Sequence, residues 1–214
     1  MNKTFLRIIK RKLKPRKTAA DRAWIKLFSI NITEGDVAID CGANVGDVSA
    51  HWAKTGATIY AFEPNPHAFN ILEGRFASLK NVHCFQKAVL NRNEKVKLYF
   101  HTNSDEDELY WSQGTSLLLF KSNILKDKFK EVDAIDLTEF IQQLNRNIKV
   151  LKLDVEGVES SILRKIIEKD LHKRIEYIFA ETHDDRVPEL RAETDELRAL
   201  IKDMHVTNIN LDYQ

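Results

Sequence analysis

The segment Val37-Ala-Ile-Asp-Cys-Gly-Ala-Asn-Val-Gly46 constrains the fold of this chain more than any other part of its sequence. The apolar run from Val37 to Ile39 predicts a strand that is covered on both faces. Gly42 and Gly46 lack side chains where the chain must turn sharply and where a ligand can approach the backbone. A helix predicted from Asp47 to Thr55 would direct its free N–H groups at that ligand. This order predicts a nucleoside-type cofactor site at the edge of a parallel sheet, although a tight strand-to-helix connection alone would also use both glycines.

Two carboxylates indicate which cofactor this site prefers. Asp40 stands where the turn begins, so it would repel a pyrophosphate but attract the ammonium of a methionine moiety. Glu63 ends a second strand, Ile59-Tyr-Ala-Phe-Glu63, and can accept hydrogen bonds from both hydroxyls of a ribose. The dinucleotide fingerprint G-x-G-x-x-G is missing, which disfavours a nucleotide-binding oxidoreductase. The residues therefore favour S-adenosylmethionine.

Four segments, in this order along the chain, carry a family resemblance. Asp40-Cys-Gly-Ala-Asn-Val-Gly46 resembles the first motif of class I methyltransferases, D/E-x-G-x-G-x-G, and Asn44 in place of its middle glycine is typical of the FkbM family. Ala61-Phe-Glu-Pro-Asn-Pro66 resembles the second motif of that family. Val150-Leu-Lys-Leu-Asp-Val-Glu-Gly-Val-Glu159 is similar to its K-x-D-x-E-G-x-E element, and Glu181-Thr-His183 matches its E-x-H element.

The resemblance runs from about Gly35 to about His183 and implies both a fold and an activity. The implied fold is α/β, a Rossmann-like doubly wound sheet of the class I methyltransferase type. The implied activity is transfer of a methyl group from S-adenosyl-L-methionine, most simply to a hydroxyl of a sugar, glycan or small-molecule natural product. The residues expected to bind this cofactor are Asp40, Gly42, Ala43, Asn44, Gly46, Glu63, Pro64 and Ala88, the last beside the adenine after a third strand at Val82 to Gln86.

The reacting end of the site is expected where two later strands end. Asp154 emerges from the apolar strand Val150 to Leu153, and a carboxylate there needs a partner. Glu156 follows at the start of the next helix, whereas Glu159 fits either the site or a cap of that helix.

A strand at Glu176 to Ala180 delivers Glu181 and His183 to the same rim, two positions apart and facing the same way. Methyl transfer to an alcohol requires removal of one proton, and a histidine with a pKa near neutrality suits that role. The alternative is that His183 caps the strand end or bonds to backbone. Asp154, Glu156, Glu181 and His183 are the predicted catalytic residues. Asp184 and Asp185 with Asp154 offer an alternative oxygen-rich site for a divalent ion, but loop carboxylates are more often solvated or ion-paired, so no metal ligand is predicted.

Composition bounds the organisation of the chain. Its 214 residues predict a basic helical segment over residues 1–30 and one methyltransferase domain over residues 31–214. Two cysteines give no disulfide framework, and no apolar run is long enough to span a membrane, so we expect a reduced, cytoplasmic compartment. Residues 1–17 hold eight basic and no acidic residues, which leaves 25 basic against 32 acidic residues elsewhere. That segment could cover the sheet as a solvated helix, touch the inner face of a membrane peripherally, or contact nucleic acid.

Several expectations concern the acceptor and the edges of the sheet. Asn65-Pro-His-Ala-Phe69 resembles the N-P-P-F/Y box of base methyltransferases but follows the second strand rather than the fourth, so nucleic acid is disfavoured as a partner. His101 to Lys121 could form a substrate-facing flap or a plain loop. A sixth strand at Val206 to Leu211 leaves no room for the antiparallel seventh strand of the class, so the sheet is either shortened or covered by a partner chain. Oligomeric state stays open, as does a non-catalytic cofactor-binding or membrane-docking module that retains the fold.

Overall fold

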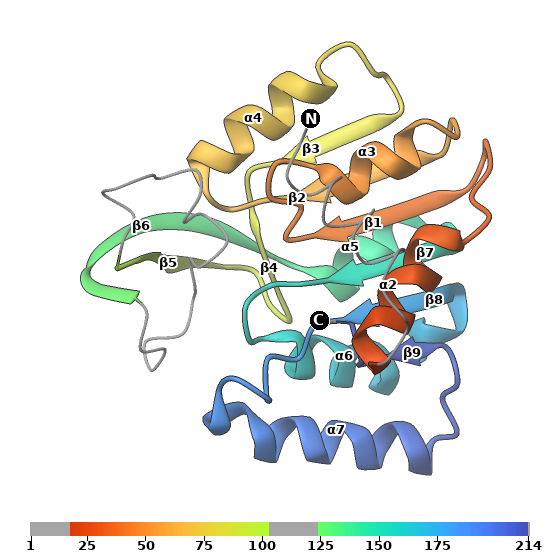
Figure 1. Cartoon of the computed structure of the whole chain (residues 1–214), viewed down its shortest axis with the longest axis vertical. Coiled ribbons are helices and arrows are strands. Elements are labelled where there is room, and N and C mark those ends of the chain that lie inside the picture. Colours follow the sequence, from red (N-terminus) through yellow and green to blue (C-terminus); the bar gives the residue numbers. More distant parts are fainter. Residues whose placement is uncertain (1–17, 103–123, 214) are drawn as a thin grey trace.

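The centre of the molecule is a twisted sheet of parallel strands (Figure 1). The computed structural model describes residues 18–102 and 124–213. Within them the sheet has six strands in the order β3-β2-β1-β7-β8-β9, and every neighbouring pair is parallel. The strand order reverses between β1 and β7, so a crevice is expected at the carboxyl ends of these two strands. The strands are β1 (Val37–Cys41), β2 (Thr58–Phe62), β3 (Val82–Phe85), β7 (Ile148–Leu153), β8 (Ile175–Ala180) and β9 (Ile209–Asn210).

Helices cover both faces of this sheet, as expected of a doubly wound fold. One apolar cluster joins the sheet to α2 (Ala19–Ser29), α3 (Asp47–Ala53) and α4 (Pro66–Phe76). A second cluster joins the opposite face to α5 (Leu137–Leu144), α6 (Glu159–Glu168) and α7 (Arg191–Asp203). Two short 3-10 turns, η2 (Leu171–Arg174) and η3 (Pro188–Leu190), precede β8 and α7.

Alternation along the strands decides which side chains reach which helices. In β1, Val37 and Ile39 belong to the cluster of α5, α6 and α7, whereas Ala38 belongs to the cluster of α2, α3 and α4. Because side chains of a strand alternate between faces, Asp40 shares the face of Ala38. Lys152 of β7 is its Cα partner across the strand pair. Two opposite charges are therefore buried together on an otherwise apolar face.

A second, smaller sheet of three strands follows β3 in the chain, with the order β4-β6-β5. Its strands are β4 (Ala88–Leu90), β5 (Glu94–His101) and β6 (Ile124–Asp136). The sequence pattern alone predicts only a short strand at Val132 to Ile135, because the amino-terminal half of β6 is rich in charged residues and gives little hydrophobic signal. Antiparallel pairing with β5 holds that half of β6 in the sheet.

Local residue types mark the starts of the helices that follow β2 and β6. Helix α4 begins at Pro66, a residue type that favours the first turn of a helix, and α5 begins after Asp136, whose side chain accepts hydrogen bonds from the backbone N–H groups of Thr138 and Glu139. The sixth strand predicted at Val206 to Leu211 was wrong in length, because β9 is only two residues long, and an antiparallel bridge between Glu181 and Asp212 lies beyond it.

The predictions for residues 1–17 and nearly all of those for the flap fall outside the described residues. Among the described residues, no helix combines the length and apolar character that crossing a membrane requires.

Candidate active site

Three residues of the turn between β1 and α3 have left-handed backbone conformations. Gly42, Asn44 and Gly46 all have positive φ, at 74°, 50° and 82°. The N–H groups of Gly42 and Ala43 both donate to the carbonyl of Phe62, at 3.0 and 2.9 Å, which ties the turn to the end of β2. Asparagine is one of the few non-glycine residues that tolerates this conformation, which explains how Asn44 can replace a glycine.

Gly42 and Gly46 are required for different reasons. A Cβ at Gly42 would lie 1.8 Å from the carbonyl oxygen of Asp154, a backbone atom at the end of β7. A Cβ at Gly46 would lie 2.6 Å from side-chain atoms of Leu72 and Phe76 in α4. Gly42 therefore lets the turn between β1 and α3 touch the segment that carries Asp154, and Gly46 lets α3 begin against α4.

Glu63 lies at the carboxyl end of β2 and connects two backbone segments. One carboxylate oxygen accepts from the N–H of Asn44 at 2.8 Å and the other from the N–H of Asn65 at 2.8 Å. Each oxygen can accept a further hydrogen bond, as contact with ribose hydroxyls would require. That contact stays a prediction. The residue is buried, and this burial raises the pKa of Glu63 to about 7 despite the two backbone donors.

Asp40 lies beneath the turn and has no exposed surface. Its carboxylate accepts from the Ser49 hydroxyl at 2.7 Å, and its other oxygen lies 3.4 Å from the ammonium of Lys152. The ammonium that Asp40 meets is thus one of the protein's own, rather than the methionine ammonium expected from the sequence. Direct contact of Asp40 with a cofactor stays a prediction, and its observed side-chain partners are Ser49 and Lys152.

Two expected cofactor residues have modest surroundings. Pro64 is half-buried directly after Glu63. The side chain of Ala88 packs with Leu90, Leu98 and other apolar residues of the three-stranded sheet. The proposed contact of Ala88 with an adenine is not tested by these surroundings.

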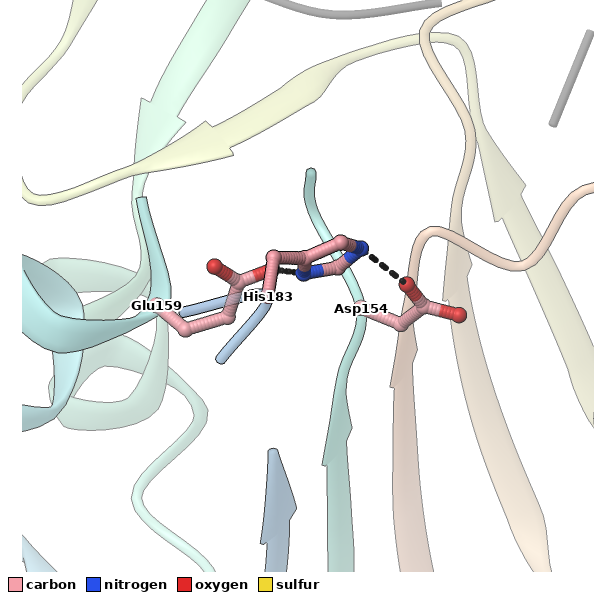
Figure 2. Close-up of side chains that lie close together, drawn as sticks. All are labelled: Asp154, Glu159 and His183. Carbon is pink, nitrogen blue, oxygen red and sulfur yellow. Dashed lines mark ion pairs between the residues drawn. The ribbon is translucent and has the colours of Figure 1, made fainter. Parts of the chain in front are cut away.

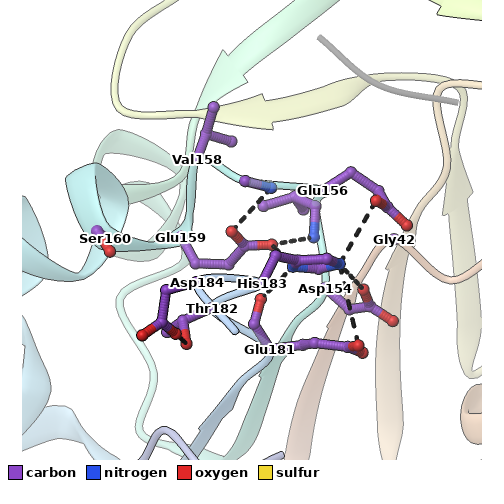
Figure 3. Close-up of polar contacts among 12 residues, drawn as sticks. Gly42, Asp154, Glu156, Val158, Glu159, Ser160, Glu181, Thr182, His183 and Asp184 are labelled. Carbon is purple, nitrogen blue, oxygen red and sulfur yellow. Dashed lines mark hydrogen bonds and ion pairs between the residues drawn. The ribbon is translucent and has the colours of Figure 1, made fainter. Parts of the chain in front are cut away.

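The four predicted catalytic residues meet at one place, around the imidazole of His183 (Figure 3). Its Nε2 lies 3.4 Å from Glu156, 3.9 Å from Asp154 and 3.9 Å from Glu181. Its Nδ1 is 2.6 Å from the backbone carbonyl of Glu181, to which an N–H can donate. Asp154 and Glu156 follow β7 while Glu181 and His183 follow β8, so the rim of the sheet brings two distant motifs together as the sequence predicted.

The charge of His183 differs from the expectation. Burial opposes protonation of the ring, but Glu156, Glu159 and Asp154 outweigh burial and raise the pKa of His183 to about 9. The near-neutral pKa expected of a general base is therefore wrong for this environment, because four carboxylates surround one imidazole. At neutral pH the ring is an imidazolium that holds these carboxylates together. Its part in catalysis stays a prediction.

Glu159 binds the loop that precedes α6 and does not cap the helix itself. It is the first residue of α6 and is buried. Its two oxygens accept from the N–H groups of Val155 and Gly157, at 2.8 and 2.9 Å. Burial raises the pKa of Glu159 to about 7 although His183 lies nearby. Glu159 thus fixes the loop that presents Asp154 and Glu156.

The same residues offer a poor arrangement for a metal ion. Ligand atoms of Asp154, Glu159 and His183 lie within 4.8 Å of one another. Figure 2 shows, however, that the two carboxylates lie at opposite edges of the ring: Glu159 is 3.6 Å from Nδ1 and Asp154 is 3.9 Å from Nε2. A metal ion would also have to compete for Glu159 with the N–H groups of Val155 and Gly157.

The alternative oxygen-rich site of Asp154, Asp184 and Asp185 does not form. Figure 3 shows Asp184 turned away from Asp154. Asp184 instead binds Arg198 of α7 at 2.9 Å, and Asp185 faces Arg186 at 3.4 Å. Ion pairing with nearby arginines is the reason that these loop aspartates do not converge.

Lys152 is the site residue that sequence reasoning passed over. Its ammonium donates to the carbonyl of Gly42 at 2.8 Å and lies 3.4 Å from Asp154 as well as from Asp40. The available signal was a lysine within an apolar strand that is buried on both faces. An ammonium in that position needs carboxylates beside it.

The strand order, the glycine turn after β1, the acid that ends β2 and the polar rim beyond β7 and β8 together define a class I methyltransferase. A family model described as the methyltransferase FkbM domain matches residues 40–206, most of the chain. The chain therefore belongs to the FkbM family of S-adenosylmethionine-dependent methyltransferases.

Individual relatives are distant. The chain is 25% identical over 195 residues to the 31-O-demethyl-FK506 methyltransferase FkbM of Streptomyces tacrolimicus, covering 79% of this chain and 73% of the relative. It is similar to the crystal structure of methyltransferase FkbM from Methylobacillus flagellatus KT, with 12% identity and a TM-score of 0.46 over 74% of this chain and 35% of that one. It is also similar to SMU.1697c, a methyltransferase-like protein of Streptococcus mutans solved with S-adenosylhomocysteine, with 11% identity and a TM-score of 0.46 over 86% and 81% of the two chains.

Proposed function

We propose that this protein transfers the methyl group of S-adenosylmethionine to a hydroxyl oxygen of a sugar, glycan or other small hydroxylated molecule. The name of the Streptomyces relative, an O-demethyl-FK506 methyltransferase, supports oxygen as the acceptor atom. A nucleobase is disfavoured as the methyl acceptor, because β7 leads into Asp154-Val-Glu156 rather than into the N-P-P-F/Y box of base methyltransferases.

The observation that carries this proposal is the position of Asp154 between the two halves of the site. On one side its carbonyl oxygen occupies the space where Gly42 has no side chain, and its carboxylate lies 3.4 Å from Lys152. On the other side the carboxylate lies 3.9 Å from Nε2 of His183. An acceptor held by Asp154 and His183 would therefore lie next to a cofactor held by the glycine turn.

The proposed reaction requires few catalytic steps from the protein. S-adenosylmethionine supplies an electrophilic methyl group, and in-line transfer to an alcohol requires alignment and the removal of one proton. Because His183 already holds a proton at neutral pH, a carboxylate is the better proton acceptor. Asp154 and Glu156 are the candidates, since the side chain of each is 27% exposed and can meet a hydroxyl.

Methyl transfer from labelled S-adenosylmethionine to a panel of hydroxylated sugars and polyols tests the proposal. We expect label in an acceptor that carries a free hydroxyl and none in its deoxy counterpart. His183→Ala and Asp154→Asn should lower turnover while the chain stays folded. Label that enters amines but no alcohol would overturn oxygen methylation.

Calorimetric titration with S-adenosylmethionine and S-adenosylhomocysteine separates this function from a non-catalytic module. Binding that weakens in Glu63→Ala, together with methyl transfer, supports the enzyme. Tight binding without transfer to any acceptor of the panel would favour a module that keeps the cofactor but performs no reaction.

A further inference from the structure

Lys152 is a buried cation whose position no catalytic or capping role yet explains. It lies near the end of β7, is 3% exposed, and stands directly across from Asp40 of β1. An ammonium removed from water in this way is stable only where acceptors and negative charges surround it. Its pattern of partners therefore shows what it holds in place.

Those partners belong to two different segments. The ammonium donates to the carbonyl of Gly42 at 2.8 Å and approaches that of Cys41 at 3.5 Å, both in the cofactor turn. It lies 3.4 Å from Asp40 beneath the turn and 3.4 Å from Asp154 at the reacting end. One buried side chain thus joins the turn that binds the cofactor to the first residue of the acceptor side.

The backbone of the turn and the backbone of Asp154 are held rigidly against each other. Gly42 and the carbonyl of Asp154 are so close that no Cβ fits between them. The N–H of Asp154 donates to the carbonyl of Cys41 at 3.1 Å, which fixes its backbone but leaves its carboxylate free to rotate. Lys152 draws that carboxylate toward the turn, whereas His183, 3.9 Å away, draws it toward the opposite side.

We propose that Lys152 is a positioning residue that couples occupancy of the cofactor turn to the orientation of the Asp154 carboxylate. The inference rests on the proposed function, because it gives Asp154 its place beside the acceptor. With Lys152 present, Asp154 is held between the two halves of the site. Without Lys152, only His183 attracts the Asp154 carboxylate, so the orientation of that carboxylate no longer depends on whether the turn holds a cofactor.

A double-mutant cycle on cofactor affinity tests this coupling without an acceptor. Wild type, Lys152→Met, Asp154→Asn and the double variant are titrated with S-adenosylhomocysteine. We expect Asp154→Asn to change the affinity when Lys152 is present and to leave it nearly unchanged in Lys152→Met. The expected coupling is at least about fivefold in the dissociation constant, within the range of interacting neighbours. Effects that multiply independently would overturn the proposal.

A matched control lies on the same strand. Lys149 pairs with Glu176 at 2.7 Å on the surface of the sheet. Lys149→Met should leave affinity for S-adenosylhomocysteine unchanged and show no coupling to Asp154→Asn. If Lys149→Met weakens the affinity as much as Lys152→Met, loss of general stability is the cause and the proposal fails.

A second background keeps the test decisive if Lys152→Met does not fold. Asp40→Asn removes the buried charge that Lys152→Met would leave without its lysine partner, so the cycle is repeated in Asp40→Asn. Full recovery of cofactor affinity in Asp40→Asn, Lys152→Met would show that Lys152 only neutralises Asp40, and would overturn the proposal. The proposed function fails separately, by absence of methyl transfer in the wild type, whatever the cycle gives.

Discussion

Gly42→Ala is the substitution whose cost follows most directly from the geometry of the turn. Two separate penalties apply. At φ 74° an alanine occupies the left-handed region, which costs about 1–2 kcal/mol for a residue with a Cβ. The new Cβ also lies 1.8 Å from the carbonyl oxygen of Asp154, so one of the two segments must move by more than about 1 Å to reach ordinary contact.

That movement is resisted on both sides. The N–H of Asp154 binds the carbonyl of Cys41, and the carbonyl of Leu153 accepts from the N–H of Glu181 at 3.0 Å. Forcing an extra methyl group into a rigid contact costs about 1–3 kcal/mol. We therefore expect Gly42→Ala to lower the free energy of unfolding by about 2–5 kcal/mol, a large part of the total stability of a typical domain.

Gly35→Ala separates the two penalties. Gly35 has a φ of 91°, but no atom lies within 4 Å of its hypothetical Cβ. It should therefore lose only the conformational part, about 1–2 kcal/mol. Equilibrium unfolding in urea, with equal m-values for both variants, gives the comparison. If Gly42→Ala costs no more than Gly35→Ala, the close approach of the turn to Asp154 does not exist in solution.

Two further predictions concern pH. The pKa of Glu63, raised to about 7 by burial, means that its carboxyl is protonated below pH 7 in the free protein, while donation from ribose hydroxyls would favour the ionised form. Affinity for S-adenosylhomocysteine, measured by calorimetry, should thus fall by up to about tenfold per pH unit below pH 7, and Glu63→Gln should abolish this dependence. For Asp136, burial is outweighed by hydrogen bonds from Lys165 and Thr138, which lower the pKa of the carboxyl. A lowered pKa stabilises the fold above the unfolded value of 3.8, and this contribution is lost as the pH falls through the folded value, so Asp136→Asn should flatten the acid limb of a urea-denaturation series.

Each pH prediction has its own contrary result. A wild-type affinity that is flat across pH 7 would mean that Glu63 does not bind the ribose as an ionised group. Equal acid sensitivity of wild type and Asp136→Asn would mean that the bonds of Asp136 are not maintained in solution.

The sequence was sufficient for the parts of the fold that local patterns determine. The start of helix α4 can be read from the chain, because Pro66 is a residue type that favours the first turn of a helix. Strand β1 was clear because its apolar run meets a glycine turn. The length of β6 was not predictable, because its first half is stabilised by pairing with β5 and not by an apolar pattern of its own.

The site shows the same division between local and non-local information. The sequence placed Glu181 and His183 after one strand and Asp154 and Glu156 after another. Because β7 and β8 are parallel, both strands end at the same edge of the sheet and the four residues meet there. The charge of His183 could not be read from the chain, since it depends on carboxylates gathered from two motifs. The role of Lys152 was equally hidden, because its partners lie on a different strand and loop.

The left-handed backbone of the turn has a consequence for how this site can vary. Asn44 shows that glycine itself is not required at the middle of the turn, whereas its φ of 50° shows that the conformation is. Libraries that sample this position should therefore keep their stability with glycine, asparagine or aspartate and be less stable with valine, isoleucine or threonine. The backbone conformation, rather than one particular side chain, is therefore what this position requires, and residues that tolerate positive φ should replace Asn44 at little cost.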